Sequence, residues 1–335
     1  MTSTSFFYRW YTVFVVVLVL AFAVTPTALA SSGTMLVSTN TTLTEDHYGN
    51  ILVTNSNVTL DCAGHVVFGP GVPGFNGGIN VDVGLDRVTV KRCGVTAFNV
   101  NGIYHAPGAT DCRYEANVTY RNGNHGMHLD SGNGYVVVDN IARSNGAIGI
   151  VLTGATESSI IHNTVQENQN WAGIALFDGS HDNHIINNTS VKNRDGFLLI
   201  DSTNNQLELN TASLNSIMGM NLIRSANNVV ASNTLNQNLI GLELAESSNS
   251  NTVRSNILNR NKTEGIKVFM SDGNSITRNT ANENSEIGFL VWFGSSYNTL
   301  TRNVGRRNLQ LDALDEGTGT GNVWSENNFG TTSGF

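Results

Sequence analysis

Short apolar runs alternate with polar turn residues along most of the chain. Runs such as "GIVL" at residues 149–152 and "SIIHN" at residues 159–163 are rich in β-branched residues, and Asn, Gly and Ser separate them. Runs of this length bounded by turn formers are typical of short β-strands, whereas an amphipathic helix needs a longer periodic stretch. The pattern therefore predicts an all-β protein.

The apolar runs belong to a repeat. A glycine followed by an apolar residue recurs every 22 to 24 residues, at Gly78, Gly102, Gly126, Gly149, Gly173, Gly196, Gly219, Gly241, Gly265 and Gly288. From Gly102 onwards each unit also carries two Asn residues five positions apart. The first members are Asn117, Asn140, Asn163, Asn188, Asn210, Asn233, Asn256, Asn279 and Asn303. The second members are Asn122, Asn145, Asn168, Asn193, Asn215, Asn238, Asn261, Asn284 and Asn308. A unit of this length has room for about three short strands.

Stacking the units as coils of a solenoid accounts for both series of Asn. Equivalent residues then lie one above another at the strand spacing of about 4.8 Å, so Asn side chains hydrogen-bond to one another along the axis. The two series mark two corners of each coil, and the glycine gives the third corner its backbone freedom. The first and third residues after the glycine point inward. A leucine-rich repeat has a similar period, but these units lack its frame and its helical segment.

The N-terminal segment is expected to be a secretory signal peptide. It combines one cation at Arg9, an apolar run over residues 11–24 and a small-residue site that ends at Ala30. The alternative is a retained membrane anchor, although the apolar run is short for a membrane span. With cleavage after Ala30, we expect a secreted, periplasmic or cell-surface protein with no stable membrane span.

The remaining chain divides by its regularity. We expect an N-terminal cap over residues 31–56, a β-solenoid of ten or eleven coils over residues 57–310, and a C-terminal cap over residues 311–335. Caps of this kind protect the edge strands of a solenoid from pairing with other chains. Trp324 and Phe329 fall in the C-terminal segment and are expected to be cap residues.

The net charge and the cysteines limit which ligands and metal sites the sequence allows. The formal net charge is −8, and removal of Arg9 with the signal peptide makes it −9, which argues against a nucleic-acid partner. The spacing of Cys62, Cys93 and Cys112 matches no zinc motif. Either Cys62 and Cys93 form a disulfide across adjacent coils, or the thiols are buried as small hydrophobic groups. We expect no cofactor and no metal site.

Two segments resemble a known family. These are "NVTLDCAGHVVFG" at residues 57–69 and "DRVTVKRCGVTAFNVNGIY" at residues 86–104, followed by the "SxxNxIxxNTxxxNxxxGIxL" units. The chain resembles right-handed parallel β-helix repeat proteins of the pectin-lyase-like class over roughly residues 57–328. That class includes NosD-type periplasmic proteins and alginate C5-epimerases. The resemblance implies the fold and leaves the function open among lyases, hydrolases, epimerases, adhesins and proteins without known activity.

Candidate binding residues follow from strand alternation. The second and fourth residues after the repeat glycine point outward, and the fifth adds charged and aromatic side chains. Aromatic faces stack on sugar rings, and carboxylates and amides bond to hydroxyl groups, so this column is typical of a polysaccharide-binding surface. The candidates for substrate binding are Tyr104, Phe177, Arg224, Glu243, Lys267, Phe269 and Trp292.

Candidate catalytic residues lie in the same column. Asp178 and Asp201 stack on adjacent coils at a separation used by retaining glycosidases, and His128 and Asp130 share one strand face as a base and its orienting partner. The non-catalytic alternatives are surface ion ladders, formed by Asp201, Arg224 and Glu246 and by Glu243 with Lys267, and a solvated pair of His128 and Asp130. Related epimerases carry an Asp-Pro-His-Asp motif at this place, but only Asp130 matches it.

Three functions stay open at this point. The first is an exported β-helix that binds, and in some cases modifies, a polysaccharide as lyase, hydrolase or epimerase. The second is a non-catalytic surface or adhesive solenoid, and the third is a NosD-like accessory protein in copper-site assembly. Enzymes of this fold usually have long loops that wall a cleft, whereas the spacing here is regular from Gly78 to Gly288. We therefore expect a monomer that binds polysaccharide or cell-surface glycan, and we leave open whether it is an enzyme.

Overall fold

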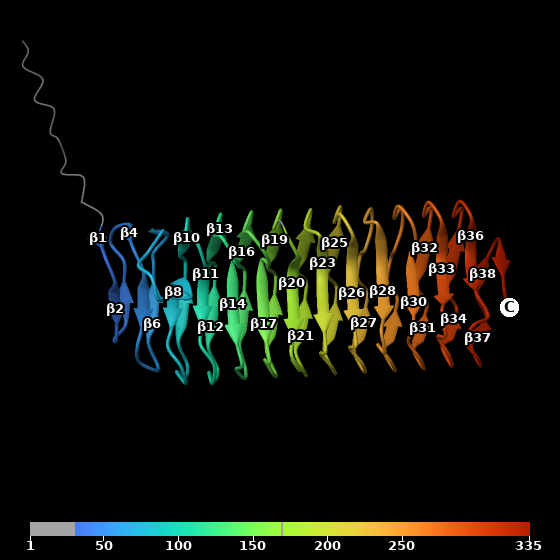
Figure 1. Cartoon of the computed structure of the whole chain (residues 1–335), viewed down its shortest axis with the longest axis horizontal. Coiled ribbons are helices and arrows are strands. Elements are labelled where there is room, and N and C mark those ends of the chain that lie inside the picture. The colour runs from blue at the N-terminus through green and yellow to red at the C-terminus, as the bar shows by residue number, and fades with distance from the viewer. Residues whose placement is uncertain (1–30, 169) are drawn as a thin grey trace, which may run out of the picture.

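A computed structural model describes residues 31–168 and 170–335 as one stack of parallel β-coils (Figure 1). The coils follow the chain along the long axis, with the first described strands at one end and the C-terminus at the other. The expected signal peptide, residues 1–30, lies outside the described residues. Within the described part, no helix has the length and apolarity needed to cross a membrane.

The long sheet has 14 strands, one from each coil. All neighbouring strands in it are parallel, and in the middle of the stack the strands reach six residues. Its strands are β2 (Met35–Val37), β5 (Ile51–Val53), β8 (Gly77–Val81), β11 (Asn101–His105), β14 (Met127–Asp130), β17 (Ile150–Thr153), β20 (Ala172–Phe177), β23 (Asp195–Ile200), β26 (Met218–Ile223), β28 (Ile240–Ala245), β30 (Ile266–Phe269), β33 (Ile287–Trp292), β36 (Leu311–Asp315) and β39 (Thr332–Ser333).

A second sheet of 13 strands follows the long sheet around each coil. It consists of β3 (Thr41–Thr42), β6 (Thr59–Asp61), β9 (Thr89–Lys91), β12 (Arg113–Glu115), β15 (Val136–Val138), β18 (Ser159–Ile161), β21 (His184–Ile186), β24 (Gln206–Glu208), β27 (Val229–Ala231), β29 (Thr252–Arg254), β31 (Ser275–Thr277), β34 (Thr299–Thr301) and β37 (Val323–Ser325).

The third side of the coil is a sheet of nine strands, continued after a gap by a sheet of three. Isolated bridges through Thr234 and Ile257 span the gap, so this side is continuous. Its strands are β1 (Ser31–Ser32), β4 (His47–Tyr48), β7 (Val66–Phe68), β10 (Gly94–Thr96), β13 (Val118–Tyr120), β16 (Ile141–Arg143), β19 (Thr164–Gln166), β22 (Thr189–Val191), β25 (Thr211–Ser213), then β32 (Thr280–Asn282), β35 (Val304–Arg306) and β38 (Asn328–Phe329).

The solenoid makes about 13 turns instead of the expected ten or eleven, because both terminal segments contribute strands to the sheets. The segment 31–56 supplies β1 to β5, and the segment 311–335 supplies β36 to β39. In the last coils Trp324 and Phe329 pack against the core, and Trp324 stacks on Phe335 with ring centroids 4.2 Å apart.

Both Asn series form the hydrogen-bonded ladders predicted from the repeat. In the first, Asn163 Nδ2 donates to Asn188 Oδ1 at 3.0 Å, and Asn188 Nδ2 donates to Asn210 Oδ1 at 3.1 Å. In the second, Asn122 Nδ2 donates to Asn145 Oδ1 at 3.1 Å. The side chains are buried, so these bonds satisfy polar groups that water does not reach.

A third ladder stabilises the corner between the long sheet and the 13-stranded sheet. It runs through Asn183, Asn205, Asn228, Asn251, Asn274, Asn298 and Asn322. Buried serines such as Ser202 and Ser225 accompany it, with the Ser202 N–H donating to Ser225 Oγ at 3.1 Å. Side-chain amides and hydroxyls therefore hold all three corners.

The repeat glycines correct one sequence interpretation. They lie at the start of the long-sheet strands, and they provide space instead of backbone freedom at the third corner. A Cβ on Gly241 would lie 2.5 Å from the Gly265 carbonyl oxygen and 2.9 Å from Asn261 Nδ2, while its φ is outside the left-handed region. The left-handed turns belong to other residues, including Asp178 (φ 53°) and Arg224 (φ 48°).

Inward-pointing apolar residues fill the interior along its whole length. Ile174 and Leu176 of β20 are buried as the repeat predicts, and equivalent residues of the other coils form one continuous core. Cys62 and Cys93 form a disulfide between adjacent coils, and Cys112 is a buried free thiol. His105, which the sequence places inward, is fully buried beside Tyr114, with His105 Nδ1 2.5 Å from the Tyr114 hydroxyl.

Candidate functional site

The outer face of the long sheet carries all the candidate site residues. We define this outer face by four rows of side chains: the residue before the repeat glycine, and the second, fourth and fifth residues after it. The rows run in register because the strands pair residue by residue, as Tyr104 does with His128 and Glu243 with Lys267. The fifth row lies where the chain turns away from the sheet, since its members take left-handed φ values.

The middle of the outer face is apolar and closed to solvent. Val151, Ala175 and Leu198 in the second row are at most 2% exposed, although strand alternation directs them outward. They pack with Ile148 and Ala172 from the row before the glycine. We call these five residues the apolar strip. Phe177, Ile200 and Ile223 of the fourth row cover one side of the strip, and Trp171 contacts Phe177 at 5.6 Å between ring centroids.

Towards the N-terminus the strip gives way to a polar cluster. The rings of Tyr104 and His128 meet edge to face at 5.4 Å between centroids, and His125 meets His128 at 5.5 Å. His128 Nε2 lies 3.1 Å from Thr153 Oγ1. Burial raises the pKa of the Tyr104 phenol, and the Asp130 carboxylate adds to that effect. Three predicted site residues, Tyr104, His128 and Asp130, therefore lie together.

Burial keeps the histidines of this cluster neutral near pH 7. It lowers the pKa of His125 to about 4, and the neighbouring His128 contributes to the decrease. Burial also lowers the pKa of His128, although Asp130 acts in the opposite direction. A neutral imidazole next to a carboxylate and a phenol is able to accept a proton from a bound ligand.

A loop beside this cluster was missed by sequence reasoning. Residues 69–76, "GPGVPGFN", connect β7 to β8 and contain two of the four prolines of the chain. A hollow next to the loop is lined by Leu52, Gly74, Phe75, Asn76, Asn80, Val81, Asp82, Tyr104 and Ala106. The signal was available in the dense Gly and Pro content of this loop, which precedes the first repeat glycine. The polar cluster therefore has a wall on one side.

Beyond the apolar strip a second polar group faces outward. Asp195 stands before its repeat glycine, and Asn221, Glu243 and Lys267 occupy the second row of the following coils. Lys267 Nζ lies 2.7 Å from Glu243 Oε1. Asp195, Asn221 and Glu243 are 3%, 7% and 8% exposed, and Asn221 Oδ1 is buried with no hydrogen-bond partner. Sequence reasoning predicted Glu243 and Lys267 as ligand contacts but missed Asp195 and Asn221.

Aromatic side chains surround Lys267 at the C-terminal end of the face. Its Nζ lies 4.8 Å from the Trp292 ring centroid and 5.5 Å from that of Phe269. The Phe269 and Trp292 rings are 5.3 Å apart, and Phe293, 55% exposed, lies 5.9 Å from Phe269. Lys267, Phe269 and Trp292, all predicted as binding residues, thus lie together in one aromatic patch with Phe293, which was not predicted, and the Lys267 ammonium faces two of the three rings.

The predicted carboxylate pair has a different environment. Arg224 binds Asp201 through Nε at 2.8 Å and Nη2 at 3.1 Å, and it reaches Glu246 through Nη1 at 2.8 Å. Asp178 and Asp201 are exposed and belong to the left-handed fifth row. The expected ladder of Asp201, Arg224 and Glu246 is therefore present, and it engages one of the two carboxylates.

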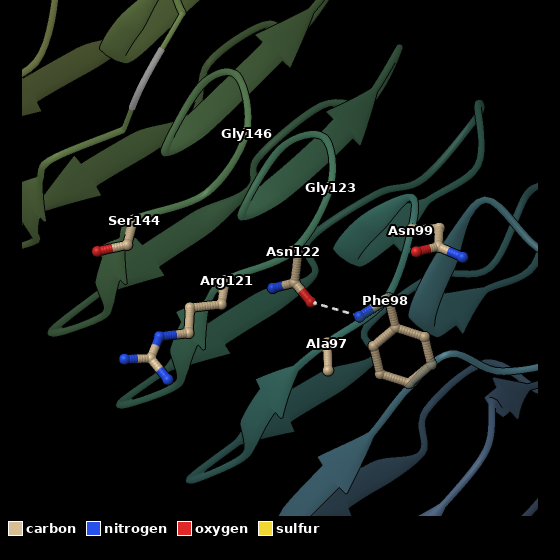
Figure 2. A pocket seen from close by; sticks show the side chains of 8 residues that line it. All are labelled: Ala97, Phe98, Asn99, Arg121, Asn122, Gly123, Ser144 and Gly146. Carbon is tan, nitrogen blue, oxygen red and sulfur yellow. Dashed lines mark hydrogen bonds between the residues drawn. The ribbon is translucent and has the colours of Figure 1, made fainter.

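A shallow depression also occurs at the corner after the nine-stranded sheet (Figure 2). It is lined by Ala97, Phe98, Asn99, Arg121, Asn122, Gly123, Ser144 and Gly146. The Phe98 N–H donates to Asn122 Oδ1 at 3.3 Å, and the Arg121 side chain extends away from it. This depression follows the second Asn ladder, and the outer-face clusters are elsewhere. In the described ranges 31–168 and 170–335, no three His, Cys, Asp or Glu side chains gather in the manner of a metal site.

Comparison with known families confirms the architecture. The model of the right handed beta helix region matches residues 77–235 and residues 148–304, which together are more than half of the chain. The chain belongs to the right-handed β-helix family. Among curated proteins, no sequence matches this β-helix.

Solved structures show the same fold at low sequence identity. The β-helix is similar to the periplasmic alginate epimerase AlgG, with a TM-score of 0.63 and 14% identity over 88% of this chain and 76% of the other. It is similar to the Dettilon tailspike protein, with a TM-score of 0.55 and 14% identity over 90% of this chain and 61% of the other. A DFA-IIIase from Arthrobacter chlorophenolicus A6 gives a TM-score of 0.53 and 14% identity over 76% and 83% of the two chains.

Proposed function

We propose that this β-helix is an exported protein that binds a polysaccharide along the outer face of the long sheet. The observation that carries the proposal is the column of outer-face side chains from Tyr104 to Trp292, in which a polar cluster and an aromatic patch lie on either side of the apolar strip and Phe177 packs along the strip. Tyr104 and Trp292 are eight strands apart, so the column is about 38 Å long at about 4.8 Å per strand. A column of this shape fits an extended polymer better than a small ligand.

The chemistry of the column supports the same ligand class. Partly exposed rings at Phe177, Phe269 and Trp292 offer apolar faces for sugar rings, and buried acceptors lie between them at Asn221 and Glu243. Two of the structural relatives bear names that refer to saccharide chemistry, an alginate epimerase and a DFA-IIIase bound to GF2. Those names describe the relatives, and they favour a polysaccharide ligand for the present chain as well.

The first test removes two rings from the column. We expect Phe177→Ala combined with Trp292→Ala to weaken retention of the purified protein on its preferred polysaccharide by at least about tenfold, because buried aromatic contacts dominate such interfaces. Affinity electrophoresis against a panel of acidic, neutral and amino-bearing polysaccharides measures this change. The melting temperature of the variant is expected to stay close to that of the parent.

The matched control is Tyr120→Ala. Tyr120 lies on β13 of the nine-stranded sheet, with the Arg143 guanidinium 4.9 Å from its ring centroid, so it is an aromatic ring paired with a cation outside the outer face. The control is expected to bind like the parent. Equal retention of the double variant and the parent would contradict polysaccharide binding at this face.

A second candidate function is chemical modification of the bound polysaccharide. The observation that favours it is the cluster of Tyr104, His128 and Asp130 beside the hollow walled by residues 69–76. If the cluster is catalytic, the protein releases reducing or unsaturated ends from its polysaccharide, and His128→Ala lowers that rate at least a hundredfold. His184→Ala, an exposed histidine of β21 on the 13-stranded sheet, is the control. Product release that persists in His128→Ala would exclude this cluster.

A further inference from the structure

The outer face carries far more acid than base. From the coil of β8 to the coil of β36, where Asp312 occupies the glycine position, its four rows contain nine acidic residues and two basic ones. The acids are Asp82, Asp130, Asp178, Asp195, Asp201, Glu243, Glu246, Glu264 and Glu316. The two bases are already engaged, Arg224 by Asp201 and Glu246, and Lys267 by Glu243. A polyanionic ligand would therefore meet like charge along the face without a free cation in these rows.

The histidines do not change this balance near neutral pH. Burial lowers the pKa values of His125 and His128, so both imidazoles are uncharged at pH 7. The negative electrostatic potential along the outer face thus favours neutral or positively charged sugars. This holds even though an alginate epimerase has the same fold.

The group of Asp195, Asn221 and Glu243 shows where a positive charge fits. Asn221 and Glu243 are directly opposite each other on β26 and β28. Asp195 Oδ1 accepts the Met218 N–H of the same β26 strand at 3.1 Å. Burial raises the pKa of the Asp195 carboxyl, and the charge of Glu243 adds to the increase, so the two carboxylates lie within electrostatic reach of each other. The buried Asn221 Oδ1 has no donor, and only one Glu243 oxygen, Oε1, contacts Lys267. The group therefore presents oxygen acceptors in excess of donors, in a site largely closed to water.

An ammonium group satisfies this arrangement better than a divalent metal ion does. A primary ammonium has three N–H donors, which equals the three side chains that supply acceptors. Calcium requires six to eight oxygen ligands, whereas the side chains of Asp195, Asn221 and Glu243 offer five oxygens, one of which already contacts Lys267. The Lys267 ammonium also repels a doubly charged ion more strongly than a singly charged ammonium. The Phe269 and Trp292 rings, which the Lys267 ammonium faces, lie nearby. They offer aromatic surface on which the ring of an amino sugar can stack.

We propose that the polysaccharide bound on this face contains amino sugars, and that the free ammonium of one sugar docks between Asp195, Asn221 and Glu243. This assignment rests on the proposed function, because it names the ligand class of the same outer face. Acetylation of the amino group removes the charge and two of the three donors, so the site distinguishes free from acetylated amino sugars.

Calorimetric titration of the purified protein with matched oligosaccharides tests the assignment. The probes are β-1,4-linked glucosamine oligomers, their fully N-acetylated counterparts and oligogalacturonate, all at low ionic strength and at pH 6, where most of the glucosamine amines are protonated. We expect the glucosamine oligomers to bind at least about tenfold more tightly than the acetylated ones, as charge-assisted hydrogen bonds require. Oligogalacturonate is expected to bind most weakly, with and without calcium.

Two substitutions then locate the ammonium. Asp195→Asn and Glu243→Gln are each expected to reduce binding of the glucosamine oligomers about tenfold and to leave binding of the acetylated oligomers unchanged. Glu157→Gln, an exposed acid in the turn before β18 and outside the outer face, is the control and is expected to bind like the parent. The comparison between free and acetylated oligomers uses the unaltered protein, so it decides the question even if a variant is unstable.

The outcomes separate the assignment from the function on which it rests. Equal affinity for free and acetylated oligomers, or tightest binding of oligogalacturonate, overturns the amino-sugar assignment while polysaccharide binding stands. Calcium-dependent binding that a chelator abolishes assigns the group to a metal ion and also overturns it. If the protein binds none of the polysaccharides in the affinity-electrophoresis panel, the result contradicts the proposed function itself.

Discussion

The carboxyl of Asp195, one residue of the outer face, makes the stability of the protein depend on pH. Burial raises the pKa of its carboxyl to about 6, although the Arg194 charge and the Met218 N–H act in the opposite direction, and Glu243 adds to the increase. In the unfolded chain the pKa is close to 3.8. The folded protein therefore binds the proton more tightly than the unfolded chain does. Stability from this group is full below about pH 4 and is lost as the pH rises through 6.

Replacement of Asp195 by Asn is expected to stabilise the protein at neutral pH. A shift of about two pKa units corresponds to about 3 kcal/mol as an upper bound on the gain in the free energy of unfolding above pH 6. The gain should fall to a small fraction near pH 4, where the folded carboxyl is protonated and the unfolded one is about half protonated. Urea unfolding of Asp195→Asn and of the parent at pH 4 and pH 8 measures it. Equal gains at both pH values would contradict the assigned cause, and Asp178→Asn serves as the exposed control.

At the scale of the element, the ladders determine how each coil holds its neighbours. Asn210 accepts hydrogen bonds from the Asn188 N–H and Nδ2, and it donates from Nδ2 to the Ile185 carbonyl and to Asn233 Oδ1. It is 1% exposed, so water does not replace these bonds when the side chain is removed. One ladder residue thus joins three successive coils.

Asn210→Ala is expected to destabilise the protein by about 2–5 kcal/mol. The substitution removes the acceptor of the buried Asn188 N–H and the Asn210 donor to the Ile185 carbonyl, whereas Asn188 Nδ2 keeps the Ile160 carbonyl as an acceptor. Each orphaned group costs about 1–3 kcal/mol. Thermal and urea unfolding measure the loss. Gln206→Ala on the exposed side of β24 is the control and should change stability by less than about 0.5 kcal/mol. A loss in Asn210→Ala no larger than in the control would show that the ladder contributes little.

Sequence periodicity predicts the elements better than it predicts their surroundings. The two Asn series are visible because each recurs at one position in nine units, from Asn117 to Asn303 and from Asn122 to Asn308. The third ladder was not predicted, although the quoted unit contains its Asn, because that Asn recurs in fewer coils, from Asn183 to Asn322. In the coil before them Ser158 takes its place, and the Ser158 N–H donates to Asn183 Oδ1. Burial of Leu198 was equally unpredictable, since alternation gives the direction of a side chain but not what packs beside it.

At the scale of the whole molecule, the candidate site residues divide into separate groups. The column predicted from alternation is present on one face, yet Tyr104, His128 and Asp130 are separated from Glu243 and Lys267 by the apolar strip. Spacing in the sequence places these residues at the correct heights along the axis. It does not reveal the hollow beside residues 69–76 or the hydrogen bond from the Met218 N–H to Asp195, because neither contact follows from the spacing of the repeat.

The regular pairing of the coils has a consequence for how such a protein changes over time. Each coil contacts its immediate neighbours, so duplication or loss of one unit of 22 to 24 residues leaves every ladder intact and moves the rest of the stack by one step. The length of the outer face therefore changes in steps of one coil. Each gained or lost coil changes the length of the outer face by about 4.8 Å and leaves the contacts within the other coils unchanged.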